Sequence, residues 1–331
     1  MNEDSPHYIE LIEETPKNRF PIMAQLGILV FVMFAIFGPL LFQKSPDEPT
    51  LTDINQNIGT ILNEEKPVSV PQKIEGVQLR ASAAFVWDIE GQRALFSKNS
   101  ETALPLASIT KLMTALIGYE LFDENKNTTV SMSAIKQEGS SGLFDGEVFK
   151  AKDLSEMALV SSSNDAAYAL AANVGSLLGS GDPTSQFIKG MNIRADELGL
   201  ETMEFKNMTG LDISSSEPGA VGSAKDVSFL MEYIITNYPE ILEPTQESSA
   251  RVYNAAGAYH EVENTNEITN KIPNMIGSKT GYTDLAGGNL TIAFDAGLNR
   301  PVIITVLGST REERFSDVLK LVAAVQKSVS Q

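Results

Sequence analysis

The sequence of 331 residues contains no cysteine and only two histidines, His7 and His260. The absence of cysteine excludes disulfide bonds and every mechanism that uses a thiolate. His7 lies in a polar stretch ahead of an apolar run, which leaves His260 as the only candidate for a catalytic or metal-binding imidazole. A zinc site built from several histidines is therefore excluded, and we expect neither a metal ion nor another cofactor. If the chain is a serine enzyme, a lysine is the more available base.

Basic residues are also scarce. The chain has 25 Lys and Arg and 43 Asp and Glu, which gives a net charge of −18. Proteins that bind nucleic acids need a basic surface that neutralises phosphates, so the composition argues against a nucleic-acid partner. The hydrophobic content of 42% is ordinary for a globular chain. The length accommodates one large domain or two smaller ones with accessory segments.

Charged residues are absent from residues 22–42, whereas residues 1–21 are polar and mostly acidic. A helix of 21 residues rises about 31 Å, the thickness of a bilayer core. A buried helix would normally carry a polar stripe, and a signal peptide would be followed by a small-x-small cleavage site; neither is present. We therefore predict an uncleaved, single-pass transmembrane anchor at 22–42. Two basic residues, Lys17 and Arg19, precede the span, whereas one, Lys44, follows it. Because basic residues favour the cytoplasmic side, we predict a cytoplasmic tail at 1–21 and a catalytic domain outside the cytoplasm.

The rest of the chain divides into a linker and one folded domain. Four prolines and mixed charges indicate a linker over 43–77, so the domain is expected over 78–331. Strands are expected near both ends of this domain, with helices between them, which predicts an α+β fold with one antiparallel sheet covered by helices. The expected strands are 84–87, 94–96, 289–294 and 301–307, and the expected helices are 154–160, 165–174, 191–198, 227–235 and 314–329.

Ser108 and Lys111 stand three residues apart at the head of an apolar stretch that we expect to form a helix. This spacing puts both side chains on one helix face, where an amine of lowered pKa can take the proton of the serine hydroxyl. The positive end of the helix dipole also favours developing negative charge. The spacing alone is not specific, since Ser133 and Lys136 repeat it without a following apolar helix.

Two further motifs follow residues 108–111. Ser162, Ser163 and Asn164 form a Ser-x-Asn motif that begins 54 residues after Ser108. A Lys-Thr-Gly motif at 279–281 begins 117 residues after Ser162, just ahead of the strand predicted at 289–294. These three motifs in this order are typical of penicillin-binding proteins and class A β-lactamases.

On these residues the chain resembles the D-alanyl-D-alanine carboxypeptidases, the low-molecular-mass penicillin-binding proteins, over about 78–329. The likeness includes four runs and then continues to Arg314; the runs are 107–115, 163–166, 207–211 and 277–283. The resemblance implies a β-lactamase/transpeptidase-like fold, in which helices cover both faces of the sheet and an all-helical subregion lies beside it. Many members carry a second, β-rich domain and a C-terminal amphipathic anchor. Since this chain stops at Gln331, we expect the N-terminal segment to replace that anchor.

The resemblance also implies the chemistry. The domain would be a serine DD-peptidase that cleaves between the two D-alanines of peptidoglycan stem peptides through an acyl-enzyme on Ser108. Lys111 would take the serine proton, its pKa lowered by the like charge of Lys279 and by partial burial. Ser162 would relay the proton to the leaving amine, and Asn164 would hold both Lys111 and the substrate amide.

Substrate binding is implied in the same way. The backbone N–H groups of Ser108 and Tyr282 would form the oxyanion hole, and Gly281 would let the substrate backbone approach the strand edge. The terminal carboxylate would be received by Lys279, Thr280 and Arg314, with Arg311 as the alternative to Arg314. β-Lactams would mimic the D-Ala-D-Ala end and trap Ser108. Asn207 and Gly210 are interpreted as a turn that shapes the fold.

Three other functions compete with the carboxypeptidase. A class A β-lactamase needs a glutamate that activates water, usually in a Glu-x-x-Leu-Asn string, and no such string lies between the second and third motifs. A DD-endopeptidase uses the same chemistry, so the sequence does not separate it. An inactive, membrane-anchored peptidoglycan-binding protein is the non-enzymatic alternative, against which the intact motif residues argue.

Overall fold

The computed structural model of the protein describes residues 72–139, 142–297 and 299–329. The predicted cytoplasmic tail, transmembrane anchor and most of the linker (1–71) lie outside the described residues. Within the described ranges, no helix has the length and apolar character needed to cross a membrane. Ile74, inside the predicted linker, is buried, and its N–H donates to the carbonyl of Leu95 at 2.8 Å, so the chain packs on the sheet from this residue onward.

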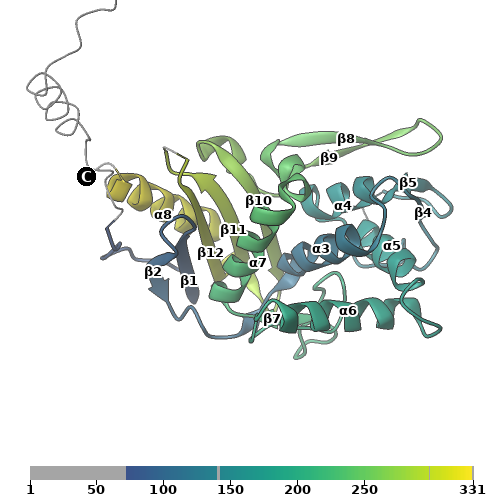
Figure 1. Cartoon of the computed structure of the whole chain (residues 1–331), viewed down its shortest axis with the longest axis horizontal. Helices are drawn as coiled ribbons and strands as arrows, with labels where there is room; N and C mark the ends of the chain where they lie inside the picture. The colour runs from purple at the N-terminus through teal and green to yellow at the C-terminus, as the bar shows by residue number, and fades with distance from the viewer. Residues whose placement is uncertain (1–71, 140–141, 298, 330–331) are drawn as a thin grey trace, which may run out of the picture. The chain divides into compact units, whose positions relative to one another are not determined.

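Both ends of the domain contribute to one five-stranded antiparallel sheet, as predicted. The strand order is β10-β11-β12-β1-β2, so β10 forms one edge (Figure 1). The strands are β1 (Ala83–Asp88), β2 (Arg93–Lys98), β10 (Met275–Thr283), β11 (Gly287–Asp295) and β12 (Pro301–Ser309). β10 lies between the rest of the sheet and the helical part of the domain, so its outer edge is where residues from both parts can meet.

Side chains on neighbouring positions of these strands point to opposite faces of the sheet. Phe85 and Ile303 belong to a core shared with α7 (Ala224–Asn237), whereas Val86 and Ile304 belong to a second core shared with α8 (Glu313–Val329). Helices therefore cover both faces, as the resemblance implied. The apolar alternation of β1 and β12 explains why these strands were predictable.

The helical subregion consists of α3 (Lys111–Leu121), α4 (Ala151–Val160), α5 (Asn164–Gly175) and α6 (Pro183–Glu197), which pack together beside the sheet (Figure 1). The helix predicted at 191–198 begins earlier, because Asp182 caps it through a hydrogen bond from the N–H of Ser185 (2.8 Å). The short elements are β3 (Leu104–Pro105), β4 (Asn127–Thr129), β5 (Val148–Lys150), β6 (Glu204–Phe205), β7 (Ala220–Gly222), β8 (Ser249–Tyr253), β9 (Tyr259–Glu263), η1 (Ala107–Thr110), η2 (Pro239–Ile241), η3 (Glu243–Gln246) and η4 (Thr269–Lys271).

Two features of the fold differ from the prediction. The Lys-Thr-Gly motif precedes β11, as predicted, but it also lies inside β10, whose strand character is hidden in the sequence by two glycines and a lysine. The hairpin of β8 and β9 was not predicted either. Val252 and Val262 are the only fully buried residues of these two strands, so the apolar signal is too sparse to predict them.

Candidate active site

Ser108 lies in the short 3₁₀ turn η1, which leads directly into α3 at Lys111. The predicted helix is present, but its first turn, which carries Ser108, is a 3₁₀ turn rather than α-helix. Residues three apart eclipse each other in a 3₁₀ helix. The Lys111 Nζ accordingly lies 2.8 Å from the Ser108 Oγ.

The side chain of Lys111 is completely buried. Its Nζ also donates to the backbone carbonyl of Thr209 at 2.9 Å. Burial disfavours the charged form and lowers the pKa of Lys111 from 10.5 to about 7. Burial was predicted as partial, but it is complete and is the cause of the shift, whereas the predicted contribution from the charge of Lys279 is not found. An amine that is neutral near pH 7 can take the proton of the neighbouring hydroxyl.

A tight turn presents the carbonyl of Thr209 to Lys111. The Oδ1 of Asn207 accepts hydrogen bonds from the N–H groups of Thr209 (3.1 Å) and Gly210 (2.7 Å), which closes the turn. The turn interpreted from sequence as shaping the fold thus also places a hydrogen-bond acceptor for the Lys111 amine. This contact was not predictable from the sequence, because a backbone carbonyl has no residue signature.

Replacing Gly210 by Ala is expected to cost about 2–5 kcal/mol of unfolding free energy. At its φ of +81° a Cβ would lie 1.8 Å from the Ala107 carbonyl oxygen, beside Ser108. The left-handed backbone costs about 1–2 kcal/mol for an L-residue, and overpacking adds about 1–3 kcal/mol. Gly257→Ala is the matched control, since its φ is +83° and nothing lies within 4 Å. Denaturant unfolding that destabilises both variants equally would contradict the prediction.

The second and third motifs meet through Ser162 and Lys279. Ser162 links α4 to α5 with a φ of 60°, and its Oγ accepts a hydrogen bond from the Lys279 Nζ at 3.0 Å. Lys279 is buried on β10 and also donates to the carbonyl of Thr280 at 3.0 Å. Burial, with the positive charges of Lys111 and Arg314, lowers the pKa of Lys279 well below its usual range.

Asn164 begins α5 and donates from its Nδ2 to the carbonyl of Glu138 at 2.7 Å. Its Oδ1 is buried and has no hydrogen-bond partner among the residues that the structure describes. The predicted contact of this oxygen with Lys111 is therefore not made. A buried acceptor without a partner costs about 1–3 kcal/mol. A ligand that brings an N–H group to this oxygen would recover that energy.

One edge of β10 is partly covered and partly open. The carbonyl of Ile276 accepts from Gln246 (3.0 Å), and the N–H of Ser278 donates to the Thr245 Oγ1 (3.0 Å), so both peptide groups point away from β11. The direction of peptide groups alternates along a strand. The N–H of Tyr282 therefore also points outward, beyond the part of the edge that η3 covers.

Gly281 is required by the turn that carries Ser108. A Cβ at this position would lie 2.8 Å from the carbonyl oxygen of Leu106 and 3.3 Å from the Cβ of Ala107. The substrate backbone was predicted to approach Gly281 closely, but the space next to its Cα is filled by Leu106 and Ala107 of the protein itself. Thr280 is also buried, and its hydroxyl lies 2.6 Å from the Thr265 hydroxyl.

Arg314, in the first turn of α8, reaches the same strand. It is 6% exposed, and its Nη1 donates to the carbonyl of Gly281 at 2.8 Å. Burial, and then the charge of Arg311, lowers the pKa of Arg314 to about 10, so it remains a cation at neutral pH. Arg311 instead lies over the ring of Tyr282, 5.3 Å from the centroid. Arg314 is thus the arginine that contacts the motif, and it adds positive charge beside Lys279 for an anionic group.

His260 is not part of this arrangement. Its Nε2 lies 2.9 Å from the Glu147 Oε1, and its ring lies 5.6 Å from that of Phe149. The hydroxyl of Ser108 is paired with the amine of Lys111 instead. The arrangement therefore favours a lysine base over an imidazole base.

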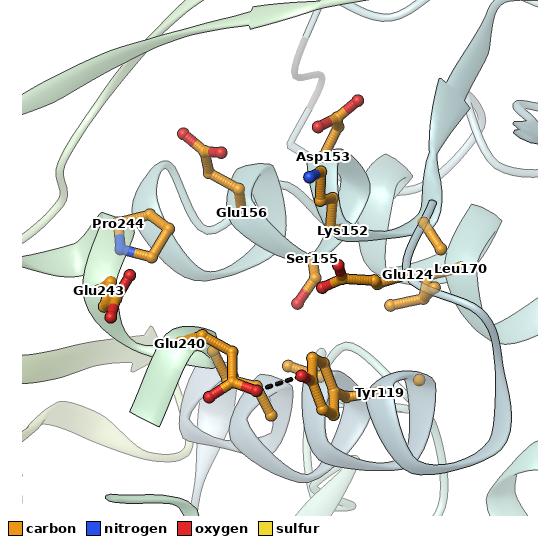
Figure 2. A pocket seen from close by; sticks show the side chains of 14 residues that line it. Tyr119, Glu124, Lys152, Asp153, Ser155, Glu156, Leu170, Glu240, Glu243 and Pro244 are labelled. Carbon is orange, nitrogen blue, oxygen red and sulfur yellow. Dashed lines mark hydrogen bonds between the residues drawn. The ribbon is translucent and has the colours of Figure 1, made fainter. Parts of the chain in front are cut away.

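A cavity of about 290 Å³ lies elsewhere, between α3, α4 and the η2–η3 segment (Figure 2). Its lining includes Glu124, Glu156 and Glu240, and the Tyr119 hydroxyl donates to Glu240. This contact raises the pKa of Tyr119 to about 12. None of the motif residues lines the cavity, and its carboxylates would repel an anion. We therefore place the candidate active site at Ser108 and the open edge of β10.

The comparisons with known proteins point to one family. Residues 66–311 match the profile of the D-alanyl-D-alanine carboxypeptidases, peptidase family S11. The chain is 31% identical over 247 residues to D-alanyl-D-alanine carboxypeptidase DacF of Bacillus subtilis, covering 73% of this chain and 61% of the relative. It is 29% identical over 251 residues to a D-alanyl-D-alanine endopeptidase of Pseudomonas aeruginosa, covering 74% of this chain and 76% of the relative. The chain thus spans less than two thirds of the first of these proteins.

The fold is also similar to solved structures. Penicillin-binding protein D2 from Listeria monocytogenes, solved in its ampicillin-bound form, superposes with a TM-score of 0.63 at 29% sequence identity. The match covers 76% of this chain and 98% of the Listeria protein. The predicted antiparallel sheet with helices is therefore confirmed as a penicillin-binding-protein fold.

Proposed function

The chain belongs to the D-alanyl-D-alanine carboxypeptidase family, and from this premise we propose that it removes the terminal D-alanine from peptidoglycan stem peptides through an acyl-enzyme on Ser108. One observation carries the proposal: the Ser108 hydroxyl lies 2.8 Å from a fully buried lysine amine whose pKa is lowered to about 7. A nucleophile and a neutral base in contact form the minimum set for acyl transfer.

The reaction begins when the Lys111 amine takes the proton of Ser108. The Ser108 Oγ then bonds to the carbonyl carbon of the penultimate D-alanine, and the negative charge that forms on the carbonyl oxygen is bound by the backbone N–H groups of Ser108 and Tyr282. The peptide C–N bond breaks, and the leaving D-alanine amine receives a proton relayed through Ser162. A water molecule then hydrolyses the ester, which releases the shortened peptide and restores the serine hydroxyl.

The residues around Ser108 match the polar groups of this substrate. Arg314, Lys279 and Thr280 receive the terminal carboxylate, because all three are buried at the third motif and the Arg314 guanidinium remains a cation at neutral pH. The unpaired Oδ1 of Asn164 accepts an amide N–H of the stem peptide. A β-lactam that presents a carboxylate and a strained amide in the same arrangement acylates Ser108.

The direct test is mass spectrometry of synthetic stem peptides incubated with the purified protein. A linear pentapeptide is expected to lose one alanine, and the same peptide with an amidated C-terminus is expected to react much more slowly. Release of monomers from a cross-linked dimer, without loss of alanine from the pentapeptide, would favour the endopeptidase activity named for the Pseudomonas relative. Rapid turnover of nitrocefin would instead indicate a β-lactamase.

Replacing Arg314 by Ala is expected to lower kcat/KM for the free pentapeptide by about 10- to 100-fold, because a hydrogen bond to a charged group contributes about 1.5–3 kcal/mol. The amidated peptide should respond less to the substitution. Arg311→Ala is the matched control, since its guanidinium lies over the exposed ring of Tyr282 and does not bond to Gly281. Equal effects of both substitutions on the free peptide would refute the assignment of Arg314.

The proposed localisation is the cell membrane. Residues 22–42 anchor the chain as a single span, with residues 1–21 in the cytoplasm and the peptidase domain outside it. The support is the run of uncharged residues with Lys17 and Arg19 on its near side. The protein should remain with membranes after washing at alkaline pH, and deletion of 1–42 should release it.

A further inference from the structure

Asn289 links the strand of the Lys-Thr-Gly motif to the turn that carries Ser108. It lies on β11, directly opposite Gly281 in the β10–β11 register. Residues opposite each other in an antiparallel pair project from the same face. The side chain of Asn289 therefore projects from the face of Gly281, on which the Ser108 turn packs, and it is completely buried there.

The amide group of Asn289 holds that turn. Its Nδ2 donates to the backbone carbonyls of Pro105 (2.9 Å) and Leu106 (3.0 Å). Leu106 is the residue that precedes η1, two positions before Ser108. Two hydrogen bonds thus fix the entry of the turn against the sheet.

The amide oxygen of Asn289 is bound at a bulge between β11 and β12. The β11–β12 register shifts between Gly288 and Leu290, and Gly308 on β12 has a φ of +66°. The N–H of Gly308 donates to the Asn289 Oδ1 at 2.8 Å. Bulges re-aim side chains and are frequent beside active sites. The bulge here fixes the amide so that its Nδ2 faces the two carbonyls.

We propose that Asn289 is a positioning residue that sets the spacing between the backbone N–H groups of Ser108 and Tyr282; this inference rests on the function proposed above. Tyr282 follows Gly281, the ladder partner of Asn289, and Ser108 lies two residues after a carbonyl that Asn289 binds. One side chain therefore connects the two strand and turn segments that supply the oxyanion hole. The N–H donors of an oxyanion hole must lie about 2.7–3.1 Å from the developing oxyanion. A misplacement of about 1 Å can cost about 100-fold in rate.

The experiment compares three variants of the full chain. Asn289→Ala removes all three hydrogen bonds, whereas Asn289→Asp keeps an acceptor for Gly308 and removes the donor to Pro105 and Leu106. Asn192→Ala is the matched control. Asn192 also donates to two carbonyls, those of Ile188 (3.0 Å) and Phe205 (2.8 Å), and accepts from one N–H (2.8 Å), but it joins α6 to β6.

Two properties of the site are measured for each variant, together with its thermal stability. The first is the second-order rate constant for acylation by a fluorescent penicillin. The second is the infrared stretching frequency of the acyl-enzyme carbonyl, labelled with ¹³C, which rises when the oxyanion-hole hydrogen bonds weaken. We expect both Asn289 variants to acylate about 10- to 100-fold more slowly and to raise the carbonyl frequency. Asn192→Ala should lower the Tm and leave both readouts unchanged.

The outcomes separate this inference from the function on which it rests. If both folded Asn289 variants acylate at the wild-type rate with an unchanged carbonyl frequency, Asn289 is only structural and the inference is wrong. If Asn289→Ala does not fold, the acylation rate and carbonyl frequency of Asn289→Asp alone test the inference. If the wild-type protein forms no acyl-enzyme, it is the proposed function that fails.

Discussion

The Ser108→Ala variant is expected to lose all covalent labelling by a fluorescent penicillin and all release of D-alanine. The Ser108 hydroxyl belongs to the first motif and lies 2.8 Å from the amine of Lys111, whose pKa is lowered to about 7. Without the Oγ there is no atom to form the ester, so the loss should be complete rather than partial. Gel fluorescence after incubation with the labelled penicillin measures it directly.

The sequence provides a matched control for this experiment. Ser133 and Lys136 have the same three-residue spacing, but both side chains are exposed on a turn between β4 and β5. Ser133→Ala should therefore label like the wild-type protein. Residual labelling of Ser108→Ala, or loss of labelling in Ser133→Ala, would show that the acyl group is carried elsewhere.

The second large effect is expected at Lys111. Its amine is a base only when neutral, and its pKa is lowered to about 7. Below that pH the neutral fraction falls about tenfold per unit, so the acylation rate should rise about tenfold per pH unit up to about pH 7 and then level off. Lys111→Met should lower the rate by about 10³-fold or more, in the range for loss of a general base, and should abolish this rise.

Stopped-flow acylation measured from pH 5 to 9 tests both parts of the expectation. Lys136→Met is the control, since it removes an exposed amine from the second Ser-x-x-Lys pair. A Lys111→Met variant that keeps the wild-type midpoint would show that another group controls the rate. Lys279 is the next candidate in that case, because it is also buried with a lowered pKa.

The helices and strands that could be predicted from sequence are those with a clear pattern of apolar residues. The strands β1, β11 and β12 are apolar runs, and α7 and α8 carry apolar residues at helical spacing, so all five lie where they were expected. The strand β10 escaped prediction because its residues serve the site. Gly281 makes room for the Ser108 turn, and Lys279 reaches Ser162, so neither resembles a core residue.

The motif residues of the site were found from sequence, but their supporting contacts were not. The fold brings Ser108 into contact with Lys111, as predicted, and Ser162 into contact with Lys279, a pair that was not predicted. The Thr209 carbonyl is a backbone group, which sequence analysis does not identify. Asn289 has no motif of its own, since its role depends on a register between strands that are only paired in the folded chain.

The complete burial of Lys111 has a thermodynamic consequence for the whole fold. Its amine has a pKa of about 7 when folded, against 10.5 as the ordinary value, so the unfolded chain binds more protons between these two pH values. The unfolding free energy therefore rises with pH across this window, and below about pH 7 the full cost of about 4–5 kcal/mol opposes folding. Domains are stable by only about 5–15 kcal/mol. The burial of this one amine therefore contributes a loss of stability that is complete in acid solution and disappears in strongly alkaline solution.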